Sequence, residues 1–181
     1  MRRWITAVCV LLALCIPRVL RAQRLITLGL GGGVTIPQGE LSSGANTGWN
    51  ALGTLIISTP MQPLGLRADV AYNQLPFSAA TKSVLGTGNQ RIGSVTANAT
   101  YRLPTPGTPI SPHLIAGVGA YRMDCSVGTA CQAVTHFGWN VGLGTKLYVI
   151  GFRSFVEVRY HRTNANGSSV NYFPVTLGFI I

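Results

Sequence analysis

The sequence predicts an all-β protein, an eight-stranded antiparallel up-and-down transmembrane β-barrel, from three observations. Eight segments alternate between apolar and polar residues with the period of a half-buried strand. The connectors between these segments are alternately short and long. The last segment keeps an apolar face up to the final residue, which in an open sheet would leave an aggregation-prone edge. A barrel removes that edge because its last strand pairs with its first.

The eight segments follow one another with no helical pattern of useful length between them. They cover approximately residues 25–35, 48–58, 64–74, 91–103, 111–122, 136–148, 152–162 and 170–181. The short connectors are residues 59–63, 104–110 and 149–151, and the longer ones are residues 36–47, 74–89, 123–135 and 163–169. Short turns at one end and long loops at the other are typical of outer-membrane barrels, in which both chain ends lie on the short-turn side.

The alternation alone does not say which face is inside, because a lipocalin-like soluble barrel turns its apolar face inward. Here the polar face carries few charges and many glycines, which suits a crowded interior. These glycines are Gly29, Gly31, Gly33, Gly117, Gly119, Gly142 and Gly144. Aromatic residues of the apolar face gather near the strand ends, as in the two girdles of membrane barrels. They are Trp49, Tyr72, Trp139, Tyr160 and Phe173 at the long-loop end, and Tyr101, Phe152 and Phe179 at the short-turn end. We therefore expect the apolar face to contact lipid.

The first 22 residues, 1–22, resemble a secretory signal, and residues 23–181 form the expected barrel domain. Arg2 and Arg3 precede an apolar stretch at 5–16, and we expect cleavage after Ala22. The apolar stretch is too short to cross a bilayer as a helix. Ten basic and four acidic residues remain after cleavage. No later stretch has the 18 apolar residues of a membrane-spanning helix.

Two cysteines, Cys125 and Cys131, remain in the mature chain. In an exported protein such a pair is expected to form a disulfide. A metal site would need more ligands than two isolated cysteines.

The chain resembles the small eight-stranded outer-membrane barrels of the OmpA/OmpX type and, more broadly, the bacterial outer-membrane protein β-barrel domain family. The resemblance is carried by residues 137–144 (FGWNVGLG), 155–161 (FVEVRYH) and 173–179 (FPVTLGF). It implies a location in the outer membrane and contact with outer-membrane lipid. Four basic residues, Lys82, Arg91, Arg122 and Arg162, lie near the outer strand ends, where the phosphates of lipopolysaccharide would be, and we expect a monomer. The chain end also resembles the signal read by the barrel-assembly machinery, although that signal usually finishes on an aromatic residue and Ile181 stands here.

Seven charged residues are expected inside the barrel: Arg67, Asp69, Arg102, Lys146, Arg153, Glu157 and Arg159. One hypothesis is a narrow pore that favours anions. The other is a filled interior in which the two acids pair with arginines, since eight strands leave room for little more than side chains and an unpaired buried charge is costly. We favour the filled interior.

One stretch, His161–Asn164, suggests an enzyme. It resembles the His-x-Ser-Asn stretch of outer-membrane lipid A deacylases, in which a histidine activates a serine and an acid orients the histidine. Here Thr163 replaces the serine, and no Asp or Glu follows His161. Asp124 and Ser126 are candidates for a palmitoyl-transferring site, but their spacing is not distinctive. The sequence therefore favours a non-catalytic barrel with a structural or adhesion-like surface role in its long loops, over a lipid A-modifying enzyme or an anion pore.

Other ligands find little support. His136 and His161 could approach one another near the outer rim, but no further metal ligand is evident. We expect no metal or cofactor. Despite the basic composition we expect no nucleic acid, because no basic helix or aromatic platform is present.

Overall fold

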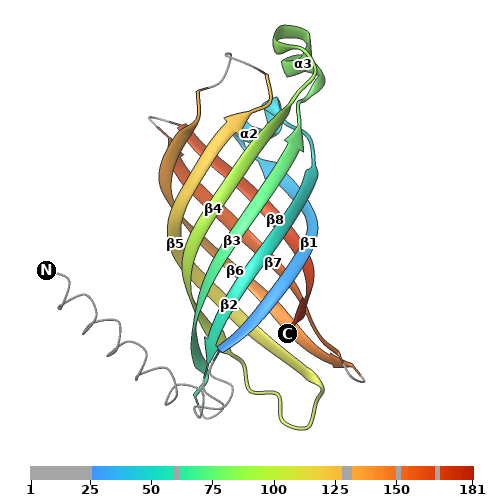
Figure 1. Ribbon diagram of the computed structural model, residues 1–181, viewed down its shortest axis with the longest axis vertical. Helices are drawn as coiled ribbons and strands as arrows, with labels where there is room; N and C mark the ends of the chain where they lie inside the picture. The colour runs from blue at the N-terminus through green and yellow to red at the C-terminus, as the bar shows by residue number, and fades with distance from the viewer. Residues whose placement is uncertain (1–25, 59–61, 128–131, 150–151, 166–167) are drawn as a thin grey trace, which may run out of the picture.

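The computed structural model describes residues 26–58, 62–127, 132–149, 152–165 and 168–181. Eight antiparallel strands, each paired with the next along the chain, close into a barrel (Figure 1). The strands are β1 (Ile26–Gln38), β2 (Gly48–Ser58), β3 (Leu64–Pro76), β4 (Asn89–Arg102), β5 (Ile110–Cys125), β6 (Val134–Val149), β7 (Phe152–Ala165) and β8 (Ser168–Ile180). The predicted fold class is confirmed, and the expected signal, residues 1–22, lies outside the described residues.

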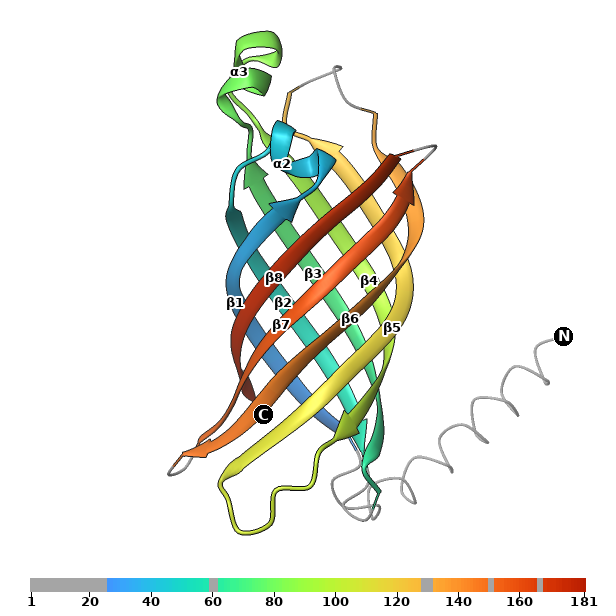
Figure 2. The same ribbon diagram turned by 180° about the vertical axis from the view of Figure 1, so that it is seen from behind.

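The barrel closes between its first and last strands (Figure 2). Val34 of β1 lies opposite Val175 of β8, and the register runs from Gly29↔Ile180 to Gln38↔Asn171. The amide of Ile181 donates to the carbonyl oxygen of Leu28 at 2.7 Å, so even the last residue is paired. The apolar chain end therefore leaves no free strand edge.

The two faces of the wall are arranged as the alternation predicts. Consecutive residues Leu66 and Arg67 are 64% and 3% exposed, so the apolar side chain faces out and the charged one faces the lumen. The aromatic residues at the long-loop end form contacts across strands. Ring centroids are 5.5 Å apart in Trp49–Tyr72, 5.6 Å in Trp139–Tyr160 and 5.0 Å in Tyr160–Phe173.

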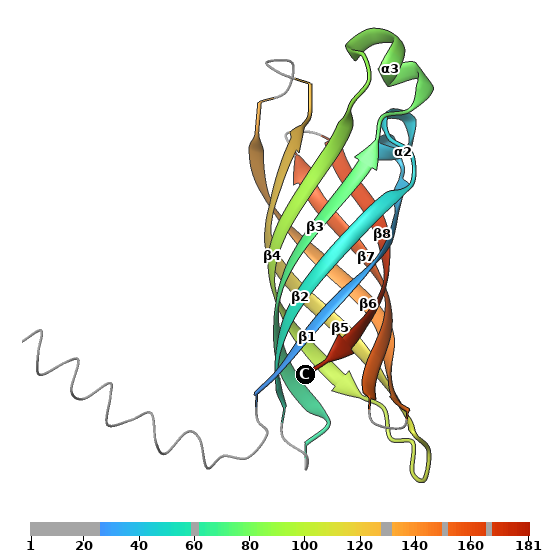
Figure 3. The same ribbon diagram turned by 45° about the vertical axis from the view of Figure 1, so that its right-hand side comes forward.

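Two short helices, which the sequence analysis missed, lie in the first two outer connectors. They are α2 (Glu40–Gly44) and α3 (Ala79–Leu85), and both stand above the same end of the barrel (Figure 3). Ser78 caps α3 by accepting a hydrogen bond from the amide of Thr81, and Gly86 ends it at a φ of 84°. No described helix is long and apolar enough to cross a membrane.

The prediction of a long loop at residues 163–169 is wrong. β7 continues to Ala165 and β8 begins at Ser168, so regular pairing extends through Asn164↔Ser169. The polar composition of this stretch favours a loop, but the pairing of β7 with β8 continues through it up to Ala165↔Ser168.

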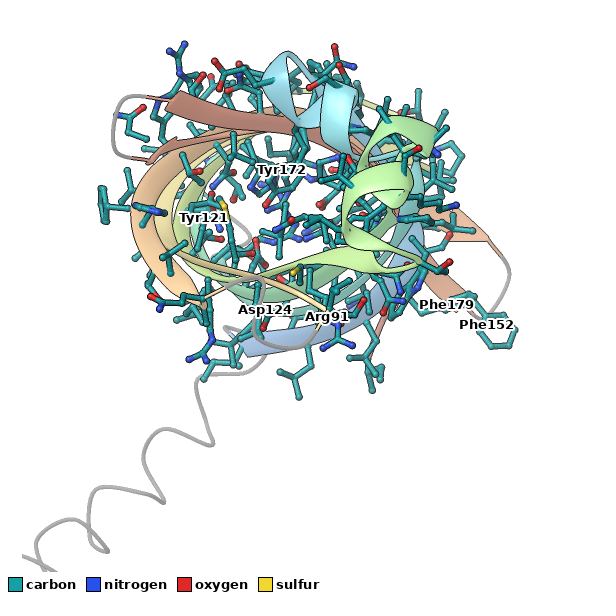
Figure 4. All side chains as sticks on the ribbon, turned by 90° about the horizontal axis from the view of Figure 1, so that it is seen from above. Arg91, Tyr121, Asp124, Phe152, Tyr172 and Phe179 are labelled. Carbon is teal, nitrogen blue, oxygen red and sulfur yellow. The ribbon has the colours of Figure 1, made fainter. Side chains whose placement is uncertain are left out.

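The top of the lumen is filled by buried apolar side chains. This apolar plug consists of Ala45, Leu75, Ile92, Tyr121, Met123 and Tyr172, with Leu41 and Val170 packed against it. Seen from above, Tyr121 and Tyr172 point into the barrel, whereas Phe152 and Phe179 point away from it (Figure 4). The plug separates the polar middle of the lumen from the outer end.

Candidate functional site

Four charged side chains form a closed ion-pair layer across the lumen. They come from β3 and β7, which lie opposite one another because four steps separate them in the ring of strands. Arg67 Nε lies 2.6 Å from Asp69 Oδ1, and Arg159 Nη1 lies 2.7 Å from Asp69 Oδ2. Arg159 Nη2 lies 2.7 Å from Glu157 Oε2, and Arg67 Nη1 pairs with Glu157 Oε1. Each acid therefore contacts both arginines, and the layer as a whole is neutral.

Three other residues join this layer that were not among the expected seven. Asn98 Nδ2 donates to Asp69 Oδ2 at 2.8 Å, and Asn140 Nδ2 donates to Asn98 Oδ1 at 2.8 Å. His113 Nε2 lies 3.3 Å from Glu157 Oε1. The alternation of β4, β5 and β6 could have identified them, because each occupies an inward position of its strand.

The remaining three of the seven expected residues do not join the layer. Arg102 and Arg153 lie at the short-turn ends of β4 and β7 and are exposed, since the barrel opens there. The guanidinium of Arg153 lies 5.9 Å from the ring centroid of Tyr148. Lys146 is half-buried below the layer. An inward position on a strand is therefore not sufficient to predict that a charged residue belongs to the ion-pair layer.

The residues of the proposed deacylase-like stretch face the lumen. His161 is 4% and Thr163 0% exposed. The Tyr121 hydroxyl lies 3.0 Å from His161 Nδ1, and the Tyr172 ring stacks on the imidazole with centroids 4.9 Å apart. Both contacting tyrosines belong to the apolar plug, so the histidine is fixed by this plug and does not face the lipid.

The approach of His136 to His161 that the sequence left open does not occur. His161 lies opposite Asn140, and His136 lies further along β6, opposite Tyr121 of β5. The register of the two strands keeps the histidines apart. Among the described residues no group of three His, Cys, Asp or Glu side chains could hold a metal ion.

The first two outer connectors form one platform at the outer end of the barrel, because they are bonded together. Ala45 and Phe77 form an isolated antiparallel bridge. The amide of Ser78 donates to the Gly44 carbonyl oxygen at 2.9 Å, and that of Asn46 donates to the Pro76 carbonyl oxygen at 2.7 Å. α3 carries the basic Lys82 and exposes an apolar residue, Val84, at 82%.

Three arginines project from the outer wall near this end and form an arginine collar: Arg91, Arg122 and Arg162. Arg122 lies opposite Gly93, two residues from Arg91, so both side chains leave the same face of adjacent strands. Asp124 lies opposite Arg91, yet Asp124 Oδ1 and Arg91 Nε have no hydrogen-bond partner among the described residues. The collar carries three positive charges, of which the one neighbouring acid, Asp124, balances one.

Cys125 is the last residue of β5, and the residue after it, Ser126, forms two hydrogen bonds with Asn89, at 2.7 Å and 3.0 Å. Cys131 lies outside the described residues. The pairing of these cysteines stays a prediction.

No protein-family model matches the chain, and no curated protein sequence does. The chain does align with solved structures of other proteins. Neisserial surface protein A aligns with a TM-score of 0.65 at 16% identity, over 86% of this chain and 96% of that one. Ail, the attachment invasion locus protein of Yersinia pestis, aligns with a TM-score of 0.54 at 14% identity, over 86% and 97%. Ail in complex with the heparin analogue sucrose octasulfate aligns with a TM-score of 0.51 at 16% identity, over the same shares. The chain thus has the fold of small eight-stranded outer-membrane β-barrels.

Proposed function

We propose that the chain is an integral protein of the outer membrane with a structural and adhesion-like surface role, exerted by its outer end and without catalysis. The observation that carries the location is the apolar wall between two aromatic girdles. Leu30, Leu66, Val70, Val95 and Leu177 are each more than half exposed, a pattern that water disfavours and lipid tails accept.

The interior supports a surface role better than a conducting one. The apolar plug and the ion-pair layer occupy the lumen in succession, and the cavities at and below these levels measure ≈ 20 and ≈ 40 Å³. Ions crossing the barrel would have to displace both groups of side chains. Specificity is therefore expected outside the lumen, on the platform that α2 and α3 form.

The chemistry of the outer end favours anionic saccharides. Lys82 and the arginine collar outnumber the two acids of this end, Glu40 and Asp124. Clustered phosphates or sulfates on a sugar would accept charge-assisted hydrogen bonds from these guanidinium groups. Lipopolysaccharide in the same leaflet presents such groups at the height of the collar. Ail, a barrel of the same fold, has been solved with a sulfated sugar analogue.

The location is tested with epitopes inserted in α3 or, as the matched control, in the opposite connector at residues 103–109. Antibody should label the α3 epitope on intact cells and the control epitope only after permeabilisation. Labelling of both epitopes on intact cells, or of neither, would contradict the proposed topology.

The ligand class is tested by thermal unfolding of the protein in phosphatidylcholine nanodiscs. Lipopolysaccharide in the disc should raise the unfolding midpoint of the wild type, and replacing Arg91, Arg122 and Arg162 together by Gln should abolish the rise. Arg153→Gln, an exposed arginine at the short-turn end of β7, is the control and should keep the rise. A parallel arm with soluble sucrose octasulfate shows whether free saccharides bind as well. An unchanged midpoint with both ligands would refute anionic-saccharide binding.

A further inference from the structure

Phe137 of β6 is an exposed aromatic residue that lies above the outer aromatic girdle. It is 68% exposed, compared with 41% for Trp139, the next outward residue below it on the same strand. Two residues of a strand span about 6–7 Å, so Phe137 rises from the girdle to the level of the arginine collar. Trp139 packs on Tyr160, whereas no ring of the described residues packs on Phe137. An apolar ring at this level, where charged headgroups begin, needs an apolar partner from outside the protein.

The two neighbouring strands each place an arginine beside Phe137. On β5, Ala120 lies opposite Phe137, and Arg122 is the next outward residue toward the outer end. On β7, Arg162 lies opposite Trp139. Both arginines therefore occupy positions diagonal to Phe137, where side-chain origins are roughly 7–8 Å apart and long side chains still reach one another. The three strands lie side by side on one face of the barrel (Figure 2).

The tilt of the strands brings these three side chains to about the same height. Strands of small outer-membrane barrels tilt by roughly 35–45°. Here a register partner on the following strand lies nearer the outer end (Figure 2). Ala120 on β5 is therefore lower than Phe137, and the two-residue step up to Arg122 compensates for this. On β7 the step down to Arg162 compensates in the opposite direction. One ligand at this height can thus contact the ring and both arginines.

Both arginines are open to an anion from outside the barrel. Arg122 and Arg162 are exposed, and neither forms an ion pair with another described residue. Asp124, the one acid beside the collar, lies opposite Arg91 and farther along β5 from Phe137 than Arg122 does. The phenyl ring stands between the two arginine side chains. The site therefore offers two separate anion positions, one on each side of an apolar ring.

We propose that Arg122, Phe137 and Arg162 bind the headgroup of one lipid A molecule, which is a disaccharide with a phosphate at each end. This inference rests on the proposed function, which assigns anionic saccharides to the arginine collar, and it adds the number of phosphates and the contact with the sugar. Each guanidinium binds one phosphate through charge-assisted hydrogen bonds. The apolar C–H face of the sugar lies on the phenyl ring, and the acyl chains extend down the wall over Trp139.

The two phosphate positions are tested by thermal unfolding in phosphatidylcholine nanodiscs that contain either bisphosphorylated or monophosphorylated lipid A with the same acyl chains. The wild-type midpoint should rise more with the bisphosphorylated form. In Arg122→Gln and in Arg162→Gln the two forms should give equal rises, because one phosphate then has no partner. Arg153→Gln, an exposed arginine at the short-turn end, should keep the wild-type difference.

Two outcomes of this experiment would overturn the proposal, and they differ in what they leave standing. Equal rises with both forms in the wild type would overturn the two-phosphate site but leave saccharide binding by the collar intact. No rise with either form would refute the proposed ligand class as well.

The role of the ring is tested with Phe137→Leu, which keeps an apolar side chain but removes the aromatic face. The rise with bisphosphorylated lipid A should be smaller in this variant. Phe152→Leu, which replaces a similarly exposed phenylalanine at the short-turn end, should retain the full rise. In the same discs, nuclear Overhauser effects should connect the ring protons of Phe137 to sugar ring protons. Effects only to acyl-chain protons would place lipid tails on Phe137 and overturn the proposed contact with the sugar.

Discussion

The ring of Phe155 on β7 lies against the bare backbone of Gly178, its register partner on β8, in the space that a β-carbon at position 178 would occupy. Gly31 of β1 lies next to the same ring, since a β-carbon there would lie 3.0 Å from Phe155 Cζ. The lumen thus accommodates one large aromatic side chain because the adjoining wall carries none. The same ring accounts for Gly29, whereas Gly117, Gly142 and Gly144 make room for Asn98, Arg159 and Glu157.

Replacing Gly178 by Ala should destabilise the barrel by about 1–3 kcal/mol, as overpacking does in a filled interior. The measurement is urea-induced unfolding in detergent micelles, followed by tryptophan fluorescence. Gly93→Ala is the matched control on the outward face, because a β-carbon at 93 would meet nothing within 4 Å. Equal stability of the Gly178 and Gly93 variants would mean that the Phe155 ring does not lie against β8.

Replacing Glu157 by Gln should cost about 3–5 kcal/mol of unfolding free energy, since it leaves the two buried arginines, Arg67 and Arg159, with Asp69 as their one shared carboxylate and so one buried positive charge uncompensated. The same unfolding assay measures it. Glu40→Gln, on exposed α2, should leave the unfolding midpoint unchanged. A Glu157→Gln protein as stable as the wild type would show that the ion-pair layer is hydrated.

Replacing Phe179 by Ala should slow insertion by the barrel-assembly machinery, because Phe179 is the last aromatic residue of the expected assembly signal. Phe152→Ala is a close control, since both rings face outward at the short-turn end. Phe179 is 59% exposed and Phe152 is 71% exposed. The fraction of heat-modifiable, folded protein in outer-membrane preparations should fall in Phe179→Ala more than in Phe152→Ala. An equal fall in both would indicate lost lipid contact and no signal function.

Overexpression should leave the mass spectrum of lipid A unchanged. His161 and Thr163 face the lumen beside the tyrosines of the apolar plug, where an acyl chain of the surrounding lipid does not reach them. Loss or gain of an acyl chain in lipid A on overexpression, reversed by His161→Ala, would contradict the non-catalytic role.

Cys125 and Cys131 should not react with a thiol reagent until the purified protein has been reduced. Closing a loop this short would stabilise the fold by about 2 kcal/mol in the chain-entropy model. Labelling of both residues without reductant would show that the exported protein keeps free thiols.

The strand pattern of this barrel could be predicted because each strand has one face on the outside of the barrel and one in the lumen. The alternation around Leu66 and Arg67 or along 173–181 therefore follows directly from the two environments. The partners inside the lumen could not be predicted in the same way. Arg67 and Glu157 are separated by 90 residues, and their meeting depends on the tilt of strands on opposite walls.

The outer end was the least predictable part. α2 and α3 are only 5 and 7 residues long, and their helical form depends on contacts such as Ser78 to Gly44 that join two distant loops. Ser78 followed by helix-compatible residues and Gly86 was the one available signal of α3. His161 shows a different limitation of the sequence. The short motif around it suggested a catalytic role, but its position on the strand decides which side chains it contacts.

The central claim, that the barrel spans lipid with its apolar face outward, is tested most directly by methyl NMR in nanodiscs whose lipids carry a nitroxide on the acyl chain. The methyl signals of Leu66 and Leu177, 64% and 56% exposed on the outer wall, should broaden strongly. Those of Leu52 and Ile115, 7% and 1% exposed in the lumen, should remain sharp. Broadening of the lumen methyls, with the outer-wall methyls sharp, would contradict this account.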